Sequence, residues 1–391
     1  MTANLGRVPT ILVVQPFYAD LTHASVNACF LKAMVLGRPD ARIVFAAHPG
    51  HYAAVLAVVP ELANMMDHRP IEVMPQGGIR YERFQYHRRL LMQHADATDA
   101  SSVVCLAIVP ETLFACVSFR LSRPAIPVLA ILHGDLSSAI GWRSKDPRRR
   151  LFDHRAAIRA AAMAGVRFVV LEHYIKRTAV QLGLIRDAQC DVWPLPVLDA
   201  EFVDACPALS PDRLRLGFLG FAKRQKGFDI FLDLVATADR HQADWIDFVL
   251  IGGIAEARYE PLPSRVSVVP GVDERANFIA GVRAVDYATL FLDDHTYRLT
   301  SSGTVVDALA ALRPVIGLQT LATREMFDGQ PVGYLCDTMD ALRTLITNRA
   351  ALFDAARYRT FQDGLLALRR GRRATELAHL MAGTIRLRKG P

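Results

Sequence analysis

The chain has 391 residues, of which 51% are hydrophobic and 22% charged, a composition typical of a globular protein. Because one hydrophobic core rarely serves more than about 300 residues, this length predicts two domains. The six cysteines form no C-x-x-C pair, which favours buried thiols in a reducing compartment over a disulfide framework or a zinc site. No apolar run reaches the roughly 18 residues of a membrane span, and the N-terminal run is too brief for a signal peptide, so we expect a cytoplasmic protein.

The formal net charge of +7 is concentrated in two basic segments, residues 143–159 and 369–389. They predict either solvated helix faces or surfaces for anionic lipid headgroups or a phosphorylated substrate. No helix-turn-helix, zinc-finger or RRM-type signature accompanies the charge, so we expect no nucleic-acid partner.

Short apolar runs alternate with amphipathic stretches along most of the chain. The runs are 10–15, 41–47, 102–109, 127–134, 166–172, 214–220, 246–253, 265–271, 287–293 and 313–318. The amphipathic stretches between them include 23–36, 111–122, 174–182, 227–239 and 304–312. This alternation predicts βαβ units and an α/β fold with parallel sheets buried on both faces. Because all these strands would be many for one sheet, we predict two Rossmann-like domains.

Two prolines and several polar residues interrupt the alternation at 204–215, which places a domain boundary there. We therefore predict an N-terminal acceptor-binding domain at 1–205 and a C-terminal nucleotide-binding domain at 206–350. Strand signals stop after about residue 350, and 351–391 are predicted to form helices that pack back on the N-terminal domain.

Tyrosine, phenylalanine and arginine interleave at 81–93. This composition suits a helix resting on an anionic membrane surface, and it equally suits an ordinary helix whose aromatic side chains lie in the core.

In open parallel sheets, ligands bind at the carboxyl ends of the strands. Directly after the predicted strand 214–220, Gly220 and Gly227 enclose three basic residues, Lys223, Arg224 and Lys226. The glycines let the backbone turn and approach closely, and the basic side chains either wait for an anion or form a solvated surface.

A second anion-seeking element is the start of the predicted helix at 304–312. Ser301, Ser302 and Gly303 precede it, and its free N–H groups together with its dipole attract negative charge. Ser302 or Thr304 could instead be a plain N-cap. Asp307 lies one turn into this helix, on a face that can reach a ribose hydroxyl. Two such elements at successive strand ends predict a diphosphate site.

On these residues the C-terminal half resembles the GT-B glycosyltransferases, most closely the retaining family four. Gly220 and Lys226-Gly227 fall at the spacing of the family's G-R-x-x-x-x-K-G, and 249–253 is similar to its I-V-G-x-G strand end. Asp307-Ala308 with 314–316 matches its E-A-x-A-x-G-x-P-V-I segment. The resemblance implies a GT-B architecture, with two domains facing across a cleft, in which Lys226 holds the donor's diphosphate and Asp307 binds the ribose.

Two positions depart from the family pattern. Phe221 stands where the family has an arginine, so that Lys223 or Arg224 would supply the second positive charge. Leu299 stands where the family has the glutamate that contacts the donor sugar. Other residues must then contact the sugar, and the candidates are Ser301, Ser302 and His295.

The N-terminal half resembles the family more loosely, over 128–135, 168–184 and 191–202. By this resemblance His133 would lie beside the donor sugar. Asp20 and His23 occupy the loop in which the family often has a glycine pair. A retaining enzyme needs no carboxylate base, because the leaving phosphate can deprotonate the acceptor. An inverting enzyme needs a base, for which Asp20, His23 or Asp135 could serve. The family match favours retention.

Asp293, Asp294 and His295 stand together, but GT-B enzymes as a class do not rely on a metal clamp, so we expect no cofactor and no metal. The sequence thus predicts a glycosyltransferase that moves a sugar from a nucleotide-diphosphate-sugar donor to a saccharide or lipid-diphosphate-linked acceptor, in cell-surface or exopolysaccharide assembly. Binding to the inner face of the membrane stays open. A sugar-nucleotide epimerase and a non-catalytic nucleotide-sugar-binding subunit are the alternatives.

Overall fold

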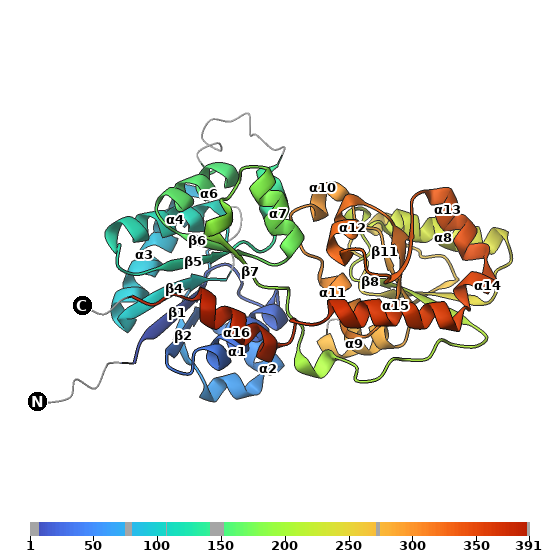
Figure 1. The fold of residues 1–391 in the computed structure, drawn as a ribbon, viewed down its shortest axis with the longest axis horizontal. Helices are drawn as coiled ribbons and strands as arrows, with labels where there is room; N and C mark the ends of the chain where they lie inside the picture. Colours follow the sequence, from blue (N-terminus) through green and yellow to red (C-terminus); the bar gives the residue numbers. More distant parts are fainter. Residues whose placement is uncertain (1–7, 75–79, 107, 141–151, 271–273, 389–391) are drawn as a thin grey trace, which may run out of the picture. The chain divides into compact units, whose positions relative to one another are not determined.

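The computed structural model describes residues 8–74, 80–106, 108–140, 152–270 and 274–388 (Figure 1). Most of the basic segment 143–159, up to residue 151, lies outside this part of the chain, as does the side chain of Asp135. The chain forms two compact units. Unit 1 comprises 1–198, 299–301 and 371–391, and unit 2 comprises 199–298 and 302–370.

Unit 1 is built on a seven-stranded parallel sheet with the strand order β3-β2-β1-β4-β5-β6-β7. Its strands are β1 (Thr10–Gln15), β2 (Arg42–Ala47), β3 (Asp67–Pro70), β4 (Ala100–Cys105), β5 (Val128–Ile131), β6 (Arg167–Val170) and β7 (Cys190–Val192). Every residue of β1 is buried, as expected of an apolar run in a sheet covered on both faces.

The helices of unit 1 follow the strands. They are α1 (Ala24–Gly37), α2 (Pro49–Val58), α3 (Arg80–Thr98), α4 (Pro110–Ser122), α6 (His154–Met163), α7 (His173–Gln181) and α16 (Ala374–Thr384), with short 3-10 turns at Pro60–Asn64, Asp135–Ala139 and Asp187–Gln189. Proline stands first in α2 and α4, where its fixed φ suits the helix start and its missing N–H costs no hydrogen bond.

The last helix of the chain belongs to unit 1 and packs on α1, as Figure 1 shows. The approach is close: a Cβ at Gly37 would lie 2.3 Å from the carbonyl oxygen of Ala378. The segment before α16 is tied down by a buried ion pair, in which Arg372 donates to Glu172 at 2.7 Å. Residues 351–370, predicted to belong to the same tail, lie in unit 2.

Unit 2 contains a six-stranded parallel sheet with the strand order β10-β9-β8-β11-β12-β13. Its strands are β8 (Leu214–Leu219), β9 (Ile246–Ile251), β10 (Val266–Val268), β11 (Tyr287–Leu290), β12 (Val315–Leu318) and β13 (Gly333–Cys336). Its helices are α8 (Phe228–Arg240), α9 (Arg275–Arg283), α10 (Asp294–Tyr297), α11 (Gly303–Ala310), α12 (Leu321–Phe327), α13 (Met339–Thr347), α14 (Arg349–Leu352) and α15 (Ala355–Leu368), with 3-10 turns at Asp199–Glu201, Arg224–Lys226 and Ala257–Tyr259.

The core of unit 2 forms around α8 and the middle of the sheet. Phe228 and Phe231, one turn apart on α8, lie on the same buried face of the helix. Their rings contact Phe218 of β8 at centroid distances of 4.9 and 5.4 Å, and Phe248 of β9 contacts Phe231 at 5.6 Å. The two parallel sheets with flanking helices confirm the predicted α/β fold class.

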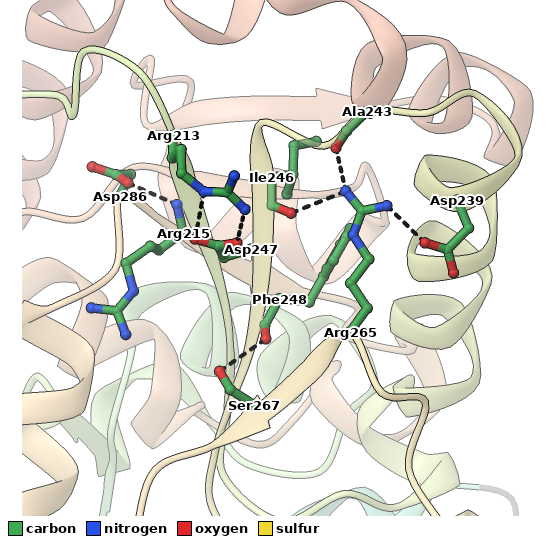
Figure 2. A network of polar contacts seen from close by, with 10 residues as sticks. All are labelled: Arg213, Arg215, Asp239, Ala243, Ile246, Asp247, Phe248, Arg265, Ser267 and Asp286. Carbon is green, nitrogen blue, oxygen red and sulfur yellow. Dashed lines mark hydrogen bonds and ion pairs between the residues drawn. The ribbon is translucent and has the colours of Figure 1, made fainter.

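At the amino ends of the unit 2 strands, two arginines are paired with carboxylates (Figure 2). Arg213 donates to the carboxylate of Asp247 at 2.6 Å, and Arg265 donates to Asp239 at 2.7 Å. These arginines hold the strand ends together and have no charge left for a ligand.

In the described residues no helix is both long and apolar enough to span a bilayer.

Candidate functional site

The loop after β8 turns back sharply at two glycines. Gly220 has φ 92° and Gly227 has φ 76°, both in the left-handed region that favours glycine. Gly227 also lies against the end of β11, where an added Cβ would stand 2.3 Å from the Cβ of Phe291. The 3-10 turn Arg224–Lys226 between the glycines returns the chain to the end of β8 and leads into α8.

This turn brings the Lys226 ammonium back over the carboxyl end of β8. A Cβ at Gly220 would lie 2.5 Å from Lys226 Nζ and 3.5 Å from Cγ2 of Thr304, which stands in the first turn of α11. Because β8 and β11 are neighbours in the sheet, the loops that follow them meet at one edge. The structure therefore brings Thr304 to Gly220 and Lys226, from which it is far apart in the sequence.

The first turn of α11 has no side-chain cap. Ser302 is the N-cap residue, yet its hydroxyl pairs with the Thr304 hydroxyl at 3.0 Å and makes no hydrogen bond to a helix amide. A Cβ at Gly303 would meet no atom within 4 Å, so space opens in front of this helix end. The plain N-cap considered for Ser302 or Thr304 is therefore not what these hydroxyls form.

The ammonium of Lys226 carries a charge that the described residues leave unpaired, because none of their side chains forms a hydrogen bond or ion pair with it. Burial and the neighbouring charge of Lys223 lower its pKa, while the carboxylate of Asp307 acts in the opposite direction. A partly buried cation without a partner is unfavourable in the empty protein and favours an anionic ligand. This differs from Arg213 and Arg265 in Figure 2, whose guanidinium groups have carboxylate partners.

Asp307 lies in the same region and makes a contact that the sequence did not suggest. Its Oδ1 accepts a hydrogen bond from Arg275 Nη2 at 2.6 Å, and the same guanidinium donates to both carboxylate oxygens of Glu201 at 2.7 and 2.6 Å. Burial raises the pKa of Glu201, which Arg275 partly counteracts. Burial works to lower the pKa of Arg275, but the two carboxylates raise it overall.

Arg275 falls in no recognisable motif, and Glu201 lies in the loosely matching segment 191–202 at a position for which the family pattern specifies no residue. The one available signal was position: Arg275 begins the helix that follows β10, and ligand-binding residues gather at such strand-to-helix junctions.

The other residues predicted to bind the donor do not all lie close to Lys226. Lys223 is close enough to affect the pKa of Lys226, whereas Arg224 is exposed and donates its backbone N–H to Glu256 Oε1 at 2.9 Å. Lys223 is therefore the better candidate for a second positive charge. Ser301 directly precedes the N-cap residue Ser302 in the chain but is grouped with unit 1, and its part in the site stays a prediction. Phe221 is 55% exposed and covers Gly253.

The acidic pair at the start of α10, Asp293 and Asp294, has structural partners. Asp293 caps α10 by accepting from the Thr296 N–H at 2.8 Å, and Asp294 accepts from the Ala322 N–H at 2.8 Å. The neighbouring His295 is exposed. Among the residues that the structure describes, no group of three or more metal-ligating side chains occurs. A metal-independent reaction stays a prediction.

In unit 1, histidines cluster at the carboxyl end of the sheet. The ring of His133, after β5, meets that of His23 at 4.3 Å and 83°, and His23 also contacts Tyr18 at 4.8 Å. His51 Nδ1 lies 2.8 Å from the Asp20 carbonyl and must donate to it, so its Nε2 accepts from the Asn27 amide at 2.9 Å. We call His23, His51 and His133 the imidazole cluster.

The members of the imidazole cluster are held neutral. Burial lowers the pKa of His133 to about 3 and that of His23 to about 4, with neighbouring histidines adding to the effect. Burial also lowers the pKa of His51. Neutral His133 can accept or donate a hydrogen bond near neutral pH but cannot offer a positive charge to an anion.

Asp20 is exposed, its Oδ1 accepts from the Thr22 N–H at 2.9 Å, and hydrogen bonding to the Thr22 side chain and then to its N–H lowers the pKa of the Asp20 carboxyl. It lines a cavity of about 350 Å³ together with Tyr18, Thr22 and His48. His133 does not line this cavity, so the two residues predicted to be catalytic stand in different surroundings within unit 1.

The imidazole cluster should make the protein less stable in acid. The folded pKa values lie below the usual value near 6.5, so between about pH 6.5 and pH 4 the unfolded chain binds protons that the folded chain does not. The free energy of unfolding should therefore fall as the pH falls through this window. Urea unfolding at about pH 7.5 and about pH 5 measures this.

His23→Asn is the matched variant for that experiment. Asparagine tolerates the left-handed backbone of residue 23, φ 60°, and does not titrate. It should reduce the pH dependence. If the free energy of unfolding falls equally between about pH 7.5 and about pH 5 in the variant and in the wild type, His23 does not cause this effect.

The segments considered for membrane binding take part in the fold of their units. On α3, Tyr86 donates its hydroxyl to the Glu72 carbonyl, Phe84 packs near Phe152 with ring centroids 6.4 Å apart, and Tyr81 is exposed. In the basic tail, Arg372 is buried against Glu172. Because Tyr81 is exposed and Phe84 and Tyr86 are only partly buried, these contacts do not decide between the two interpretations of 81–93, and membrane binding stays a prediction.

No protein-family model and no curated protein sequence matches the chain. The fold does match solved structures. HepE of Anabaena, in complex with UDP and glucose, is similar with a TM-score of 0.65 and 12% identity, over 95% of this chain and 98% of that chain. Sucrose-phosphate synthase from Thermosynechococcus elongatus is similar with a TM-score of 0.65 and 14% identity, over 96% of this chain and 98% of that chain. UDP-GlcNAc 2-epimerase from Neisseria meningitidis, bound to UDP-GlcNAc, is similar with a TM-score of 0.60 and 13% identity, over 96% of this chain and 99% of that chain.

At such low identity the similarity shows the fold alone. The chain has the GT-B fold, as predicted from the sequence, and this fold is shared by glycosyltransferases and by sugar-nucleotide epimerases.

Proposed function

We propose that the protein is a glycosyltransferase that binds a nucleotide-diphosphate-sugar donor on unit 2. One observation carries this proposal: the unpaired Lys226 ammonium stands beside Gly220 and the uncapped first turn of α11. A diphosphate would give the ammonium its missing counter-ion and the helix amides their missing acceptors. The same interactions stabilise a nucleotide diphosphate as it leaves during sugar transfer.

The finer parts of the proposal rest on the family resemblance and on residue types. We propose transfer with retention, with a saccharide or lipid-diphosphate-linked saccharide as acceptor and His133 taking part in turnover. An inverting reaction with Asp20 as base is the alternative, and its exposed carboxylate is ionised at neutral pH. NMR of the product's anomeric proton separates the two outcomes. Association with an anionic membrane and a role in cell-surface glycan assembly belong to the same proposal.

A thermal-shift panel with UDP-, GDP-, ADP- and CMP-sugars tests donor binding. A ligand that binds only the folded state raises the melting temperature according to its affinity. We expect one nucleotide diphosphate sugar to raise it, and the free nucleotide diphosphate to do so as well, because the site described here recognises the diphosphate. If no member of the panel shifts the melting temperature, the proposal is wrong.

A sugar-nucleotide epimerase is the second candidate, favoured by the similarity to the Neisseria epimerase over nearly the whole chain. Incubation with the donor alone, followed by analysis of the sugar products, separates the two functions. An epimerised sugar formed without any acceptor supports the epimerase. Binding of the donor without turnover under any condition would indicate a non-catalytic subunit.

A further inference from the structure

Three elements of unit 2 meet in one hydrogen-bonded chain, Glu201–Arg275–Asp307. Glu201 ends the 3-10 turn Asp199–Glu201, Arg275 begins α9, and Asp307 lies in the middle of α11. Arg275 donates from Nε and Nη2 to the two oxygens of Glu201, and Nη2 also donates to Asp307 Oδ1 at 2.6 Å. We call this chain the carboxylate–arginine chain.

The carboxylate–arginine chain fixes the orientation of Asp307. The side chains of Glu201 and Asp307 are only 7% and 9% exposed. Two buried carboxylates this close would repel each other without the guanidinium between them. The two-pronged contact to Glu201 holds the plane of the guanidinium, and the guanidinium in turn holds one oxygen of Asp307.

The second oxygen of Asp307 is left available. Within the described residues Oδ2 has no hydrogen-bond partner. The fully buried side-chain atoms without a hydrogen-bond partner do not include Oδ2, so this oxygen has accessible surface. Asp307 is also near enough to Lys226 to act on the pKa of its ammonium. A carboxylate oxygen that is held in place and still open stands close to the charge that we assign to the diphosphate.

We infer that Arg275 and Glu201 are positioning residues that hold the Asp307 carboxylate to accept a hydrogen bond from a ribose hydroxyl of the donor nucleotide. This inference rests on the proposed donor site. It adds that the ribose contact which the family resemblance implies for Asp307 depends on two further residues, Arg275 and Glu201, that do not themselves touch the ligand.

The test compares ribonucleotides with deoxyribonucleotides. Calorimetric titrations of the wild type use UDP, 2′-deoxy-UDP and 3′-deoxy-UDP, with the corresponding GDP and ADP series in parallel. A hydrogen bond to a charged acceptor corresponds to a loss of about tenfold or more in affinity when the hydroxyl is missing. We therefore expect one deoxy form of the bound nucleotide to bind about tenfold more weakly than the ribose form.

The decisive variant is the double substitution Arg275→Met with Glu201→Gln. It removes one positive and one negative charge, so the net charge near the diphosphate is unchanged and only the support of Asp307 is lost. We expect the ratio of ribose to deoxy affinity to fall towards one, while the affinity for the deoxy form stays at the wild-type value. A structural defect alone would weaken both forms together. Arg275→Lys, which keeps the charge but loses the planar fork, should give an intermediate ratio.

The outcomes separate this inference from the proposed function. If the folded double variant keeps the wild-type ratio, the inference is wrong. If the double variant does not fold, Arg275→Lys decides, and an unchanged ratio there overturns the inference. If the wild type binds UDP, GDP or ADP through Lys226 without preferring ribose, the inference fails and the proposed function stands. If no nucleotide diphosphate binds, the proposed function itself fails.

Discussion

Lys226→Ala should weaken the binding of a nucleotide diphosphate by about 1.5–3 kcal/mol, which is roughly a tenfold to hundredfold rise in Kd. The ammonium is partly buried and unpaired among the described residues, so it gives its full charge-assisted contact to the ligand. Its removal should not destabilise the empty fold, because a partly buried cation without a counter-ion is itself unfavourable. Isothermal titration with UDP and GDP, alongside thermal unfolding of the free protein, measures both effects.

Lys176→Ala is the matched control for this experiment. Lys176 belongs to unit 1 and its ammonium lies 3.0 Å from Asp187, so the variant removes the same charge from the chain but not from unit 2. It should leave Kd unchanged. Equal effects of the two substitutions would mean that the net charge of the protein attracts the nucleotide, and that residue 226 has no site of its own.

His133→Ala should reduce turnover by about a hundredfold or more and leave the Kd of the nucleotide diphosphate nearly unchanged. Proton transfer or hydrogen bonding by a positioned side chain typically contributes about this much to a rate. Because the pKa of His133 is about 3, the neutral imidazole is present throughout the working range. Titration of His133 should therefore contribute no inflection near pH 6.5 to the pH profile of turnover, and the profiles of the wild type and the variant should have the same shape in this range.

His241→Ala is a suitable control, because His241 is exposed at the end of α8 and lies in unit 2. Turnover is measured as nucleotide release in the presence of the acceptor, and as release by hydrolysis when no acceptor is known. Wild-type turnover in His133→Ala would remove this residue from the reaction, whereas a parallel loss of nucleotide binding would indicate a structural role.

The interior of both sheets was predictable from the sequence, whereas of the four edge strands only β10 was predicted, as the run 265–271. Central strands such as β1 and β8 are buried on both faces, so the sequence shows them as continuous apolar runs. The missed strands β3, β7 and β13 are edge strands. An edge strand can expose much of its length, and β3 consists of Asp67, His68, Arg69 and Pro70 with only one position partly buried. Its pairing depends on β2, which its own residues do not reveal.

The candidate site divides in a similar way. Gly220, Lys226 and Gly227 stand on one short loop, so their spacing in the sequence already suggests their proximity. The contact of Arg275 with Glu201 joins residues 74 positions apart and exists only because α9 packs beside the turn that begins unit 2. Arg224 also stands close to Lys226 in the sequence, but its side chain is exposed, and its part in the site stays a prediction.

The placement of α16 has a consequence for how the chain reaches its folded state during synthesis. A ribosome finishes all of unit 2 before it makes the helix that covers α1, although α1 is among the first segments to emerge. Until then the apolar residues of α1 that meet α16 lack their native cover. Unit 2 can therefore complete its core first, and unit 1, which begins earlier, is the later of the two to be finished.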